Sequence, residues 1–112
     1  MGASQDTMNR NEDARKFVEE AILGHQVVIF SKPSCPYCTQ AKKAFKTENI
    51  EFKDFNLSQR PDCSDVQDVL MEITGARSVP RVFINGSCIG GGSETLSLQR
   101  QNKLKELINV KS

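Results

Sequence analysis

The sequence predicts a single α/β domain built on a mixed β-sheet. Helical patterns alternate with short apolar runs along the 112 residues, and this order is typical of α/β proteins. A helix separates the first two predicted strands, so those strands run parallel. Two further apolar segments flank Asn85-Gly86, a pair that tolerates the positive φ angles of a type I′ turn. The last two strands therefore form an antiparallel hairpin.

The first predicted helix ends near Gly24. Its apolar residues recur at helical spacing and are Ala14, Phe17, Val18, Ala21 and Ile22. Residues 1–11 are polar and show no periodicity, so we expect a flexible N-terminal segment there and a domain over residues 12–112. The run Val27-Val28-Ile29-Phe30 comes next. A continuous apolar run of this kind is typical of a strand that is covered on both faces.

Three elements follow in the middle of the chain. Pro36 fits the first turn of a helix, where its missing N–H costs no hydrogen bond. The inward stripe of that helix is Ala41, Ala44 and Phe45. Residues 50–57 predict a second strand, although the alternation breaks around Asp54. The third helix has Gly75 in the place of a C-cap. Its apolar residues at helical spacing are Val66, Val69, Leu70 and Ile73.

The end of the chain predicts the hairpin and a terminal helical region. The run Gly90-Gly91-Gly92 indicates a flexible turn after the hairpin, and Ser93 is suited to cap the next helix. The apolar residues of the terminal region are Leu96, Leu98, Leu104, Leu107 and Ile108.

Composition narrows the function classes. The formal net charge of +1 argues against a polyanion binder, so we expect no nucleic-acid partner. No apolar stretch approaches the roughly 20 residues that span a bilayer, so we expect no membrane association. Four cysteines without a secretory leader favour reactive thiols in a reducing compartment. Acidic residues near the N-terminus disfavour a mitochondrial presequence, and we expect a cytoplasmic protein.

The tetrapeptide Cys35-Pro36-Tyr37-Cys38 follows the first apolar strand directly. A strand that turns into a helix at this point places Cys35 at the helix N-terminus, where the local positive charge favours thiolate over thiol. Cys38 lies one turn inside the helix and is shielded. Lys32 lies three residues upstream and is either a source of positive potential or an ordinary solvated lysine. This pattern predicts thiol–disulfide exchange.

A zinc site is the alternative interpretation of two cysteines at this spacing. Structural zinc takes four ligands, typically from a second pair of cysteines or histidines. Here Cys63 and Cys88 are isolated, and His25 is the only histidine. We expect no metal. Cys88 is predicted to be a packed thiol, whereas Cys63 follows Asp62 in a polar turn and is predicted to be exposed and without a role.

A second informative segment is Ser78-Val79-Pro80, just before the hairpin. A proline supplies no donor at the start of a strand. A cis bond before Pro80 would turn the backbone of Val79 toward the active-site thiol. Arg77 and Arg81 flank this segment and either steer anionic substrates or are simply solvated.

The chain resembles a dithiol glutaredoxin of the thioredoxin superfamily over roughly residues 14–110. The residues that carry the resemblance are Cys35-Pro36-Tyr37-Cys38, the stretch from Thr74 to Ile84, and Gly90-Gly91-Gly92-Ser93-Glu94. The resemblance implies a thioredoxin-like fold, with a central four-stranded mixed sheet in the order 2-1-3-4 and about five flanking helices. It also implies that Cys35 is the nucleophile that becomes glutathionylated and that Cys38 is the resolving thiol.

The same resemblance implies a glutathione site. Lys32 and Gln67 match residues that hold the glycine end of glutathione, and Tyr37 matches one that lines its groove. Val79 matches the residue whose backbone pairs with the cysteinyl part, and Pro80 matches the cis-proline. Gly91, Ser93 and Glu94 match the segment that binds the γ-glutamyl carboxylate and amine. Helix-start N–H groups suit a carboxylate and an acidic side chain suits an ammonium, although the glycine turn alone also fits a plain connection.

Three residues depart from the family pattern. Ser78 replaces the usual Thr, and Gly92 stands where several relatives carry an additional cysteine. Glu94 is longer by one methylene than the usual Asp, which changes the geometry of the amine contact but not its charge.

The implied activity is glutathione-dependent reduction of protein–glutathione mixed disulfides through Cys35, and of protein disulfides through Cys35 and Cys38. The implied partners are glutathione as cosubstrate, glutathionylated and disulfide-containing proteins, and glutathione reductase indirectly through glutathione. We expect a monomer.

Two rival functions stay open at this point. Some glutaredoxins hold an iron–sulfur cluster between two subunits, and Pro36 argues against this because clusters accompany a smaller or more flexible residue there. A thioredoxin is the other rival. The absence of tryptophan and the segment from Gly91 to Glu94 weigh against it.

Overall fold

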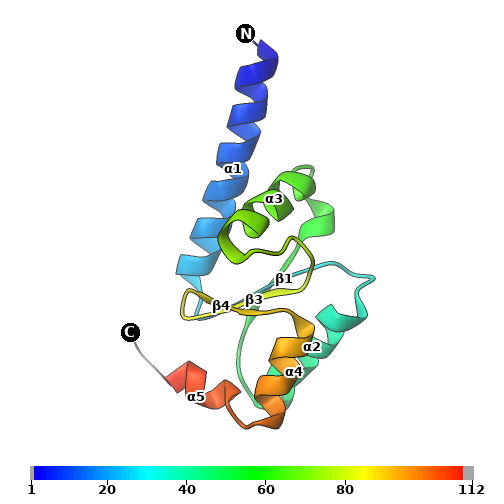
Figure 1. Cartoon of the computed structure of the whole chain (residues 1–112), viewed down its shortest axis with the longest axis vertical. Coiled ribbons are helices and arrows are strands. Elements are labelled where there is room, and N and C mark those ends of the chain that lie inside the picture. Colours follow the sequence, from blue (N-terminus) through cyan, green and yellow to red (C-terminus); the bar gives the residue numbers. More distant parts are fainter. Residues whose placement is uncertain (1, 110–112) are drawn as a thin grey trace.

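A four-stranded mixed sheet forms the centre of the structure, a computed structural model that describes residues 2–109, with side chains from residue 11 onward (Figure 1). The strand order is β2-β1-β3-β4. The elements in chain order are α1 (Gly2–Gly24), β1 (Val27–Ser31), α2 (Pro36–Thr47), β2 (Lys53–Asn56), the short 3₁₀ helix η1 (Leu57–Gln59), α3 (Cys63–Thr74), β3 (Arg81–Ile84), β4 (Ser87–Gly90), α4 (Gly92–Arg100) and α5 (Leu104–Asn109). β1 runs parallel to β2 and antiparallel to β3, and β3 runs antiparallel to β4. The predicted sheet order is confirmed.

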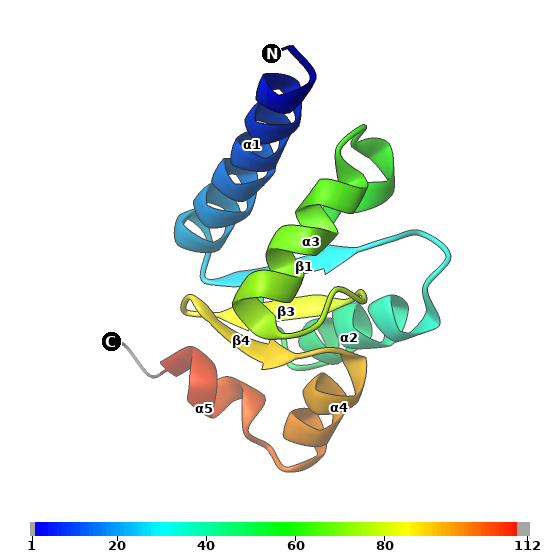
Figure 2. The ribbon, with the colours of Figure 1, turned by 45° about the horizontal axis from the view of Figure 1, so that its top comes forward.

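Helices cover both faces of this sheet. Helices α1 and α3 lie together on one face, whereas α2, α4 and α5 lie on the other (Figures 1 and 2). Among the described residues, no helix combines the length and the apolar character that crossing a bilayer requires.

The central strand β1 is buried along its whole length. Val28 and Phe30 pack into the core beneath α1 and α3, and Val27 and Ile29 pack into the core beneath α2 and α5. Successive side chains of a strand point to opposite faces, so a continuous apolar run is what a doubly covered strand requires. The prediction from this run is confirmed.

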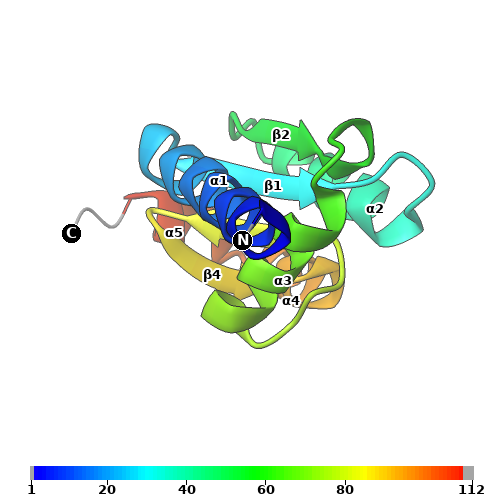
Figure 3. The same cartoon turned by 90° about the horizontal axis from the view of Figure 1, so that it is seen from above.

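The strand register gathers the chain ends of several elements at one edge of the sheet. Phe30 of β1 pairs with Arg81 of β3, so the segment after β1 and the segment before β3 meet. Ser31 pairs with Asn56 of the parallel strand β2, and Figure 3 shows these two strands running the same way. Gly90 at the end of β4 pairs with Val82. The start of α2, the segment before β3 and the turn before α4 therefore lie near one another.

Turn and cap positions follow the sequence closely. Asn85 and Gly86 have φ values of 52° and 84°, as the hairpin prediction requires. Gly75 caps α3 with a φ of 86°. The bond between Val79 and Pro80 is cis. These three predictions are confirmed.

Several element bounds differ from the sequence-based expectation. Helix α1 already begins at Gly2, within the polar segment for which no regular element was predicted; the division between residues 1–11 and 12–112 stays a prediction. β2 covers only Lys53–Asn56. The terminal helical region divides into α4 and α5, because Asn102 adopts a φ of 59° between them. Ile73 was predicted to face the core but is 46% exposed.

Arg60 and Asp62 fasten the start of α3 to α1. Arg60 donates two hydrogen bonds to the Asp62 carboxylate, at 2.7 and 2.9 Å. The guanidinium also lies 3.8 Å from the ring centre of Phe17 on α1. The hydrogen bonds from Arg60 lower the pKa of Asp62 below its ordinary value of 3.8. The charged carboxylate is therefore the form that the fold stabilises.

We predict that Asp62→Asn lowers the free energy of unfolding at neutral pH by about 1 kcal/mol, because the charge-assisted pair is lost. A carboxylate with a depressed pKa stabilises the fold above its unfolded pKa, and this contribution is lost as the pH falls through the folded pKa. Urea unfolding from about pH 7 down to about pH 3 should therefore show the two proteins converging. Asp68→Asn, at an exposed ion pair, is the control and should change stability by less than about 0.5 kcal/mol. A constant gap between Asp62→Asn and the parent protein at every pH would contradict the prediction.

Candidate active site

Cys35 is the N-cap residue of α2 and forms a disulfide with Cys38. The backbone N–H of Cys38 donates to Cys35 Sγ at 3.1 Å. Cys35 is half-buried, whereas Cys38 is 1% exposed. In the reduced state the same N–H group and the helix N-terminus stabilise negative charge on Cys35 Sγ. Only Cys35 combines this stabilisation with access from outside, so it is the nucleophile that the geometry favours.

Val79, whose bond to Pro80 is cis, lies against this sulfur. The carbonyl oxygen of Val79 lies 3.6 Å from Cys35 Sγ, although the two residues are 44 positions apart. Among the described residues, nothing accepts a hydrogen bond from the Val79 N–H. An extended backbone with a free donor beside a reactive sulfur suits a peptide-like ligand, which would pair with it as a further strand does.

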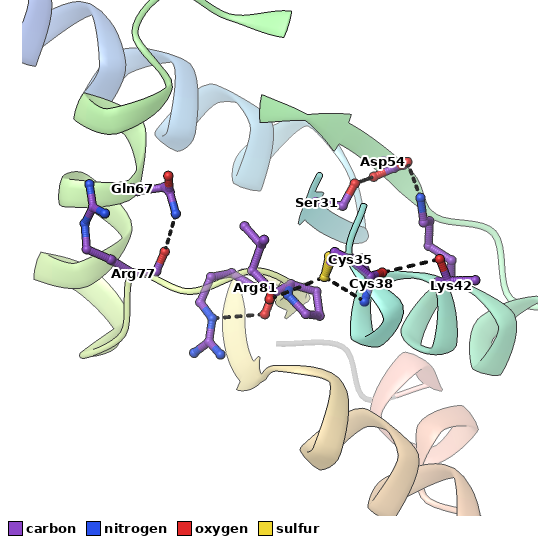
Figure 4. Close-up of a disulfide and its surroundings, with 11 residues drawn as sticks. Ser31, Cys35, Cys38, Lys42, Asp54, Gln67, Arg77 and Arg81 are labelled. Carbon is purple, nitrogen blue, oxygen red and sulfur yellow. Dashed lines mark hydrogen bonds and ion pairs between the residues drawn. A yellow bond between two sulfur atoms is a disulfide. The ribbon is translucent and has the colours of Figure 1, made fainter. Parts of the chain in front are cut away.

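Lys32 contacts Gln67 on α3, and Figure 4 shows Gln67 on that helix. Lys32 Nζ donates to Gln67 Oε1 at 3.0 Å, and Gln67 Nε2 donates to the carbonyl oxygen of Arg77 at 2.8 Å. Gln67 is only 8% exposed. Its amide is thus held in one orientation, with a second N–H on Nε2 left to donate to an anionic ligand.

Cys63 corrects a prediction. It is half-buried rather than exposed, and its thiol donates to Gln67 Oε1 at 3.6 Å. The polar sequence around it hid this contact, because the first turn of α3 packs toward the core cluster that Cys63 touches. Cys88 is half-buried and packs against the same cluster, as predicted.

Three glycines between β4 and α4 let side chains approach the backbone closely. A Cβ on Gly90 would lie 2.6 Å from Glu94 Cγ, one on Gly91 would lie 2.6 Å from Arg81 Nη2, and one on Gly92 would lie 2.8 Å from Tyr37 Cβ. A Cβ does not come so close to another heavy atom unless one of the two groups moves. Helix α4 begins at Gly92, with Gly91 rather than the predicted Ser93 at the N-cap.

Glu94 caps this helix from its third position. Its Oε1 accepts a hydrogen bond from the Gly91 N–H at 2.7 Å. That N–H is the main cause that lowers the pKa of Glu94; its own backbone N–H and the charge of Arg81 act in the same direction. The carboxylate is therefore anionic in the neutral range and able to attract a cation.

A shallow hollow joins the glycine turn to the Val79–Pro80 segment. Its lining includes Tyr37, Val79, Pro80, Gly91, Ser93 and Glu94. The structure thus brings together six of the eight predicted binding residues, and the other two, Lys32 and Gln67, form their own pair near α3. That these residues bind a ligand stays a prediction. Within residues 11–109, no three His, Cys, Asp or Glu side chains come together as metal ligands.

Arg81, for which the sequence left a steering role and a solvated role open, lines the same hollow. One further feature was not predicted from the sequence. Ser31, which is 2% exposed, donates to Asp54 Oδ1 at 2.5 Å, and Lys42 Nζ lies 3.0 Å from Asp54 Oδ2. The break in alternation at Asp54 was the signal for this network. It joins β1, β2 and α2 (Figure 4).

Known proteins match the chain over most of its length. The family model described as Glutaredoxin matches residues 27–89. The chain is 44% identical over 92 residues to "Glutaredoxin-2, mitochondrial" of Pongo abelii, covering 82% of this chain and 57% of that protein. It is 41% identical over 96 residues to "Glutaredoxin-1" of Oryctolagus cuniculus, covering 81% of this chain and 89% of that protein. The chain therefore spans little more than half the length of the first relative and most of the second.

Solved structures give the same match. The oxidised glutaredoxin 2 from Chlamydomonas reinhardtii superposes with a TM-score of 0.84 at 38% identity, covering 88% of this chain and 92% of that one. A buckwheat glutaredoxin–glutathione complex superposes with a TM-score of 0.85 at 31% identity, covering 89% of this chain and 91% of that one.

We predict that Gly92→Ala lowers the free energy of unfolding by about 1–3 kcal/mol. The new Cβ would lie 2.8 Å from Tyr37 Cβ, so α2 and α4 would have to move apart. Gly24→Ala is the matched control. Nothing lies within 4 Å of a Cβ at Gly24, so this change should be neutral or slightly stabilising. Urea unfolding of both variants in the same buffer measures the difference; equal stabilities would contradict the packing argument.

Proposed function

The chain belongs to the glutaredoxin family, and from this premise we propose that it is a glutathione-dependent thiol–disulfide oxidoreductase. The observation that carries the proposal is the position of Cys35 Sγ. It accepts the Cys38 N–H at a helix N-terminus and lies 3.6 Å from the backbone of Val79. A stabilised thiolate thus faces a backbone segment on which a peptide-like disulfide can align. The buckwheat relative, whose structure was solved as a complex with glutathione, supports glutathione as that ligand.

The first proposed route uses Cys35 alone. Its thiolate attacks the glutathione sulfur of a protein–glutathione mixed disulfide, and the protein leaves as a thiolate. The product is a disulfide between Cys35 and glutathione. The thiolate of a second glutathione attacks the glutathione sulfur of that bond, which releases oxidised glutathione and restores Cys35. One free glutathione is consumed for each mixed disulfide. Its sulfur and the glutathione sulfur of the substrate leave joined as oxidised glutathione, and the protein sulfur leaves as a thiol.

The second proposed route uses both cysteines on protein disulfides. Cys35 attacks one sulfur, and Cys38 then attacks Cys35 Sγ in the mixed disulfide and releases the reduced protein. The Cα atoms of the two cysteines are 5.1 Å apart, which is within the span of a disulfide. Glutathione then reduces the bridge. Family potentials of roughly −200 to −230 mV make cellular glutathione a competent reductant.

We propose one orientation of glutathione in this site. The ammonium of Lys32 and the remaining N–H of Gln67 suit the glycine carboxylate. The backbone of Val79 suits the cysteinyl part, with Tyr37 and Pro80 as walls of the groove. The γ-glutamyl group then reaches the turn that carries Gly91, Ser93 and Glu94. The anionic carboxylate of Glu94 would bind the ammonium of this group.

The partners in this proposal are glutathionylated and disulfide-containing proteins, with glutathione reductase acting indirectly through glutathione. We also propose that the protein acts as a monomer in the cytosol. No resident metal takes part in either route.

We predict that Cys35→Ser abolishes both activities, whereas Cys38→Ser keeps deglutathionylation and loses most protein-disulfide reduction. The reason is that Cys38 is buried and enters only to resolve a mixed disulfide. Glutathione-dependent release of a thiol from a glutathionylated peptide measures the first activity, and reduction of a protein disulfide measures the second. Cys88→Ala, at a half-buried thiol outside the proposed binding residues, is the control for general thiol loss and should retain both. Equal failure of the two active-site variants at deglutathionylation would refute the division of roles.

A further inference from the structure

Arg81 lines the hollow beside the glycine turn. Its Nε donates to the carbonyl oxygen of Pro80 at 3.1 Å, and the guanidinium then extends over Gly91. A Cβ on Gly91 would lie 2.6 Å from Arg81 Nη2. Any other residue at position 91 would therefore displace the guanidinium from its place. Figure 4 shows Arg81 between Cys35 and Arg77, with its guanidinium pointing toward the chain that leads into α4.

The two arginines that flank Val79–Pro80 differ in what they contact. Arg77 is exposed, and its guanidinium binds the carboxylate of Asp68 and both oxygens of Ser64. Arg81 is half-buried. Across the part of the chain that the structure describes, no acceptor takes a hydrogen bond from its Nη atoms. Only Arg81 thus presents unused, charged donors to the hollow.

Opposite charges face the hollow from its two sides. Arg81 and the anionic Glu94 both line it, yet no ion pair within 4 Å joins them. The two groups flank Gly91 without forming a direct ion pair. An α-amino acid head group carries a carboxylate and an ammonium on one carbon, so it matches two opposed charges at this spacing. A planar guanidinium is also the side chain best suited to bind a carboxylate through two parallel hydrogen bonds.

We propose that Arg81 binds the free α-carboxylate of the γ-glutamyl group while Glu94 holds its ammonium, so that Arg81 selects γ-linked thiols. The inference rests on the proposed function and adds a specificity residue to it. Without Arg81, the helix N–H groups of Ser93 and its neighbours would be the only donors to this carboxylate. With it, a thiol that lacks the carboxylate leaves a half-buried guanidinium without a partner, which costs free energy.

The test varies the ligand and the protein together. A peptide is linked by a disulfide either to glutathione or to glutathione whose γ-glutamyl α-carboxyl group is amidated. Single-turnover release of the peptide thiol by reduced protein isolates the attack of Cys35 and needs no second glutathione. The ratio of the two second-order rate constants is the preference for a free carboxylate.

The parent protein should prefer the free carboxylate by about tenfold, as expected for a partly exposed, charge-assisted contact. Arg81→Gln should reduce the preference to within about twofold, because the donor is gone from the protein. Arg77→Gln is the matched control and should keep the full preference, since its guanidinium is occupied on α3.

An Arg81→Gln protein that keeps the full preference would overturn the inference. Should that variant fail to fold, Arg81→Lys takes its place; it keeps the charge but loses the planar fork, and an undiminished preference there has the same meaning. The proposed function fails separately, if the parent protein releases no thiol from the glutathione-linked peptide.

Discussion

The antiparallel pairing of β1 with β3 is the constraint on which the site depends. Because Phe30 pairs with Arg81, the chain after β1 and the chain before β3 leave the sheet at the same edge. Cys35 and Val79 therefore meet although 44 positions separate them. The pairing itself rests on burial, since β1 is covered on both faces and a slip by one residue would send Val28 and Phe30 into the wrong core. The two cores thus fix the position of the reactive sulfur.

Helix α2 gives the two cysteines of the pair different environments. It begins immediately after Cys35, so the sulfur of the cap residue accepts the Cys38 N–H while the second sulfur turns inward. Burial and position at the cap thus separate two thiols that the sequence presents as a symmetric pair. Helix α4 packs against α2. This close contact requires glycine at position 92, because a Cβ there would clash with Tyr37. The same glycine turn therefore contacts the helix that begins after Cys35 and borders the hollow.

Most of the fold and the thiol pair of the site could be predicted from the sequence, because strong local sequence signals lie at these positions. The apolar run at β1, Asn85-Gly86 and Pro80 each specify a local conformation that the structure confirms. The features that could not be predicted from the sequence depend on contacts between distant segments. The hydrogen bond from Cys63 to Gln67 requires the packing of α3 against the core. The place of Arg81 requires the close approach of Gly91, which no local pattern around either residue reveals.

Glu94 shows how a departure from the family pattern follows from helix capping. Gly91 is the N-cap of α4 and has no side chain to accept a helix N–H, so the start of the helix depends on the reciprocal contact from its third position. Glutamate is the acidic residue that reaches back to the N-cap N–H from there, and Glu94 Oε1 does so at 2.7 Å. Its second carboxylate oxygen keeps its lone pairs for an ammonium. In the proposed site one side chain would therefore cap the helix and hold the ammonium of the ligand. The length of glutamate lets its carboxylate reach the N-cap N–H.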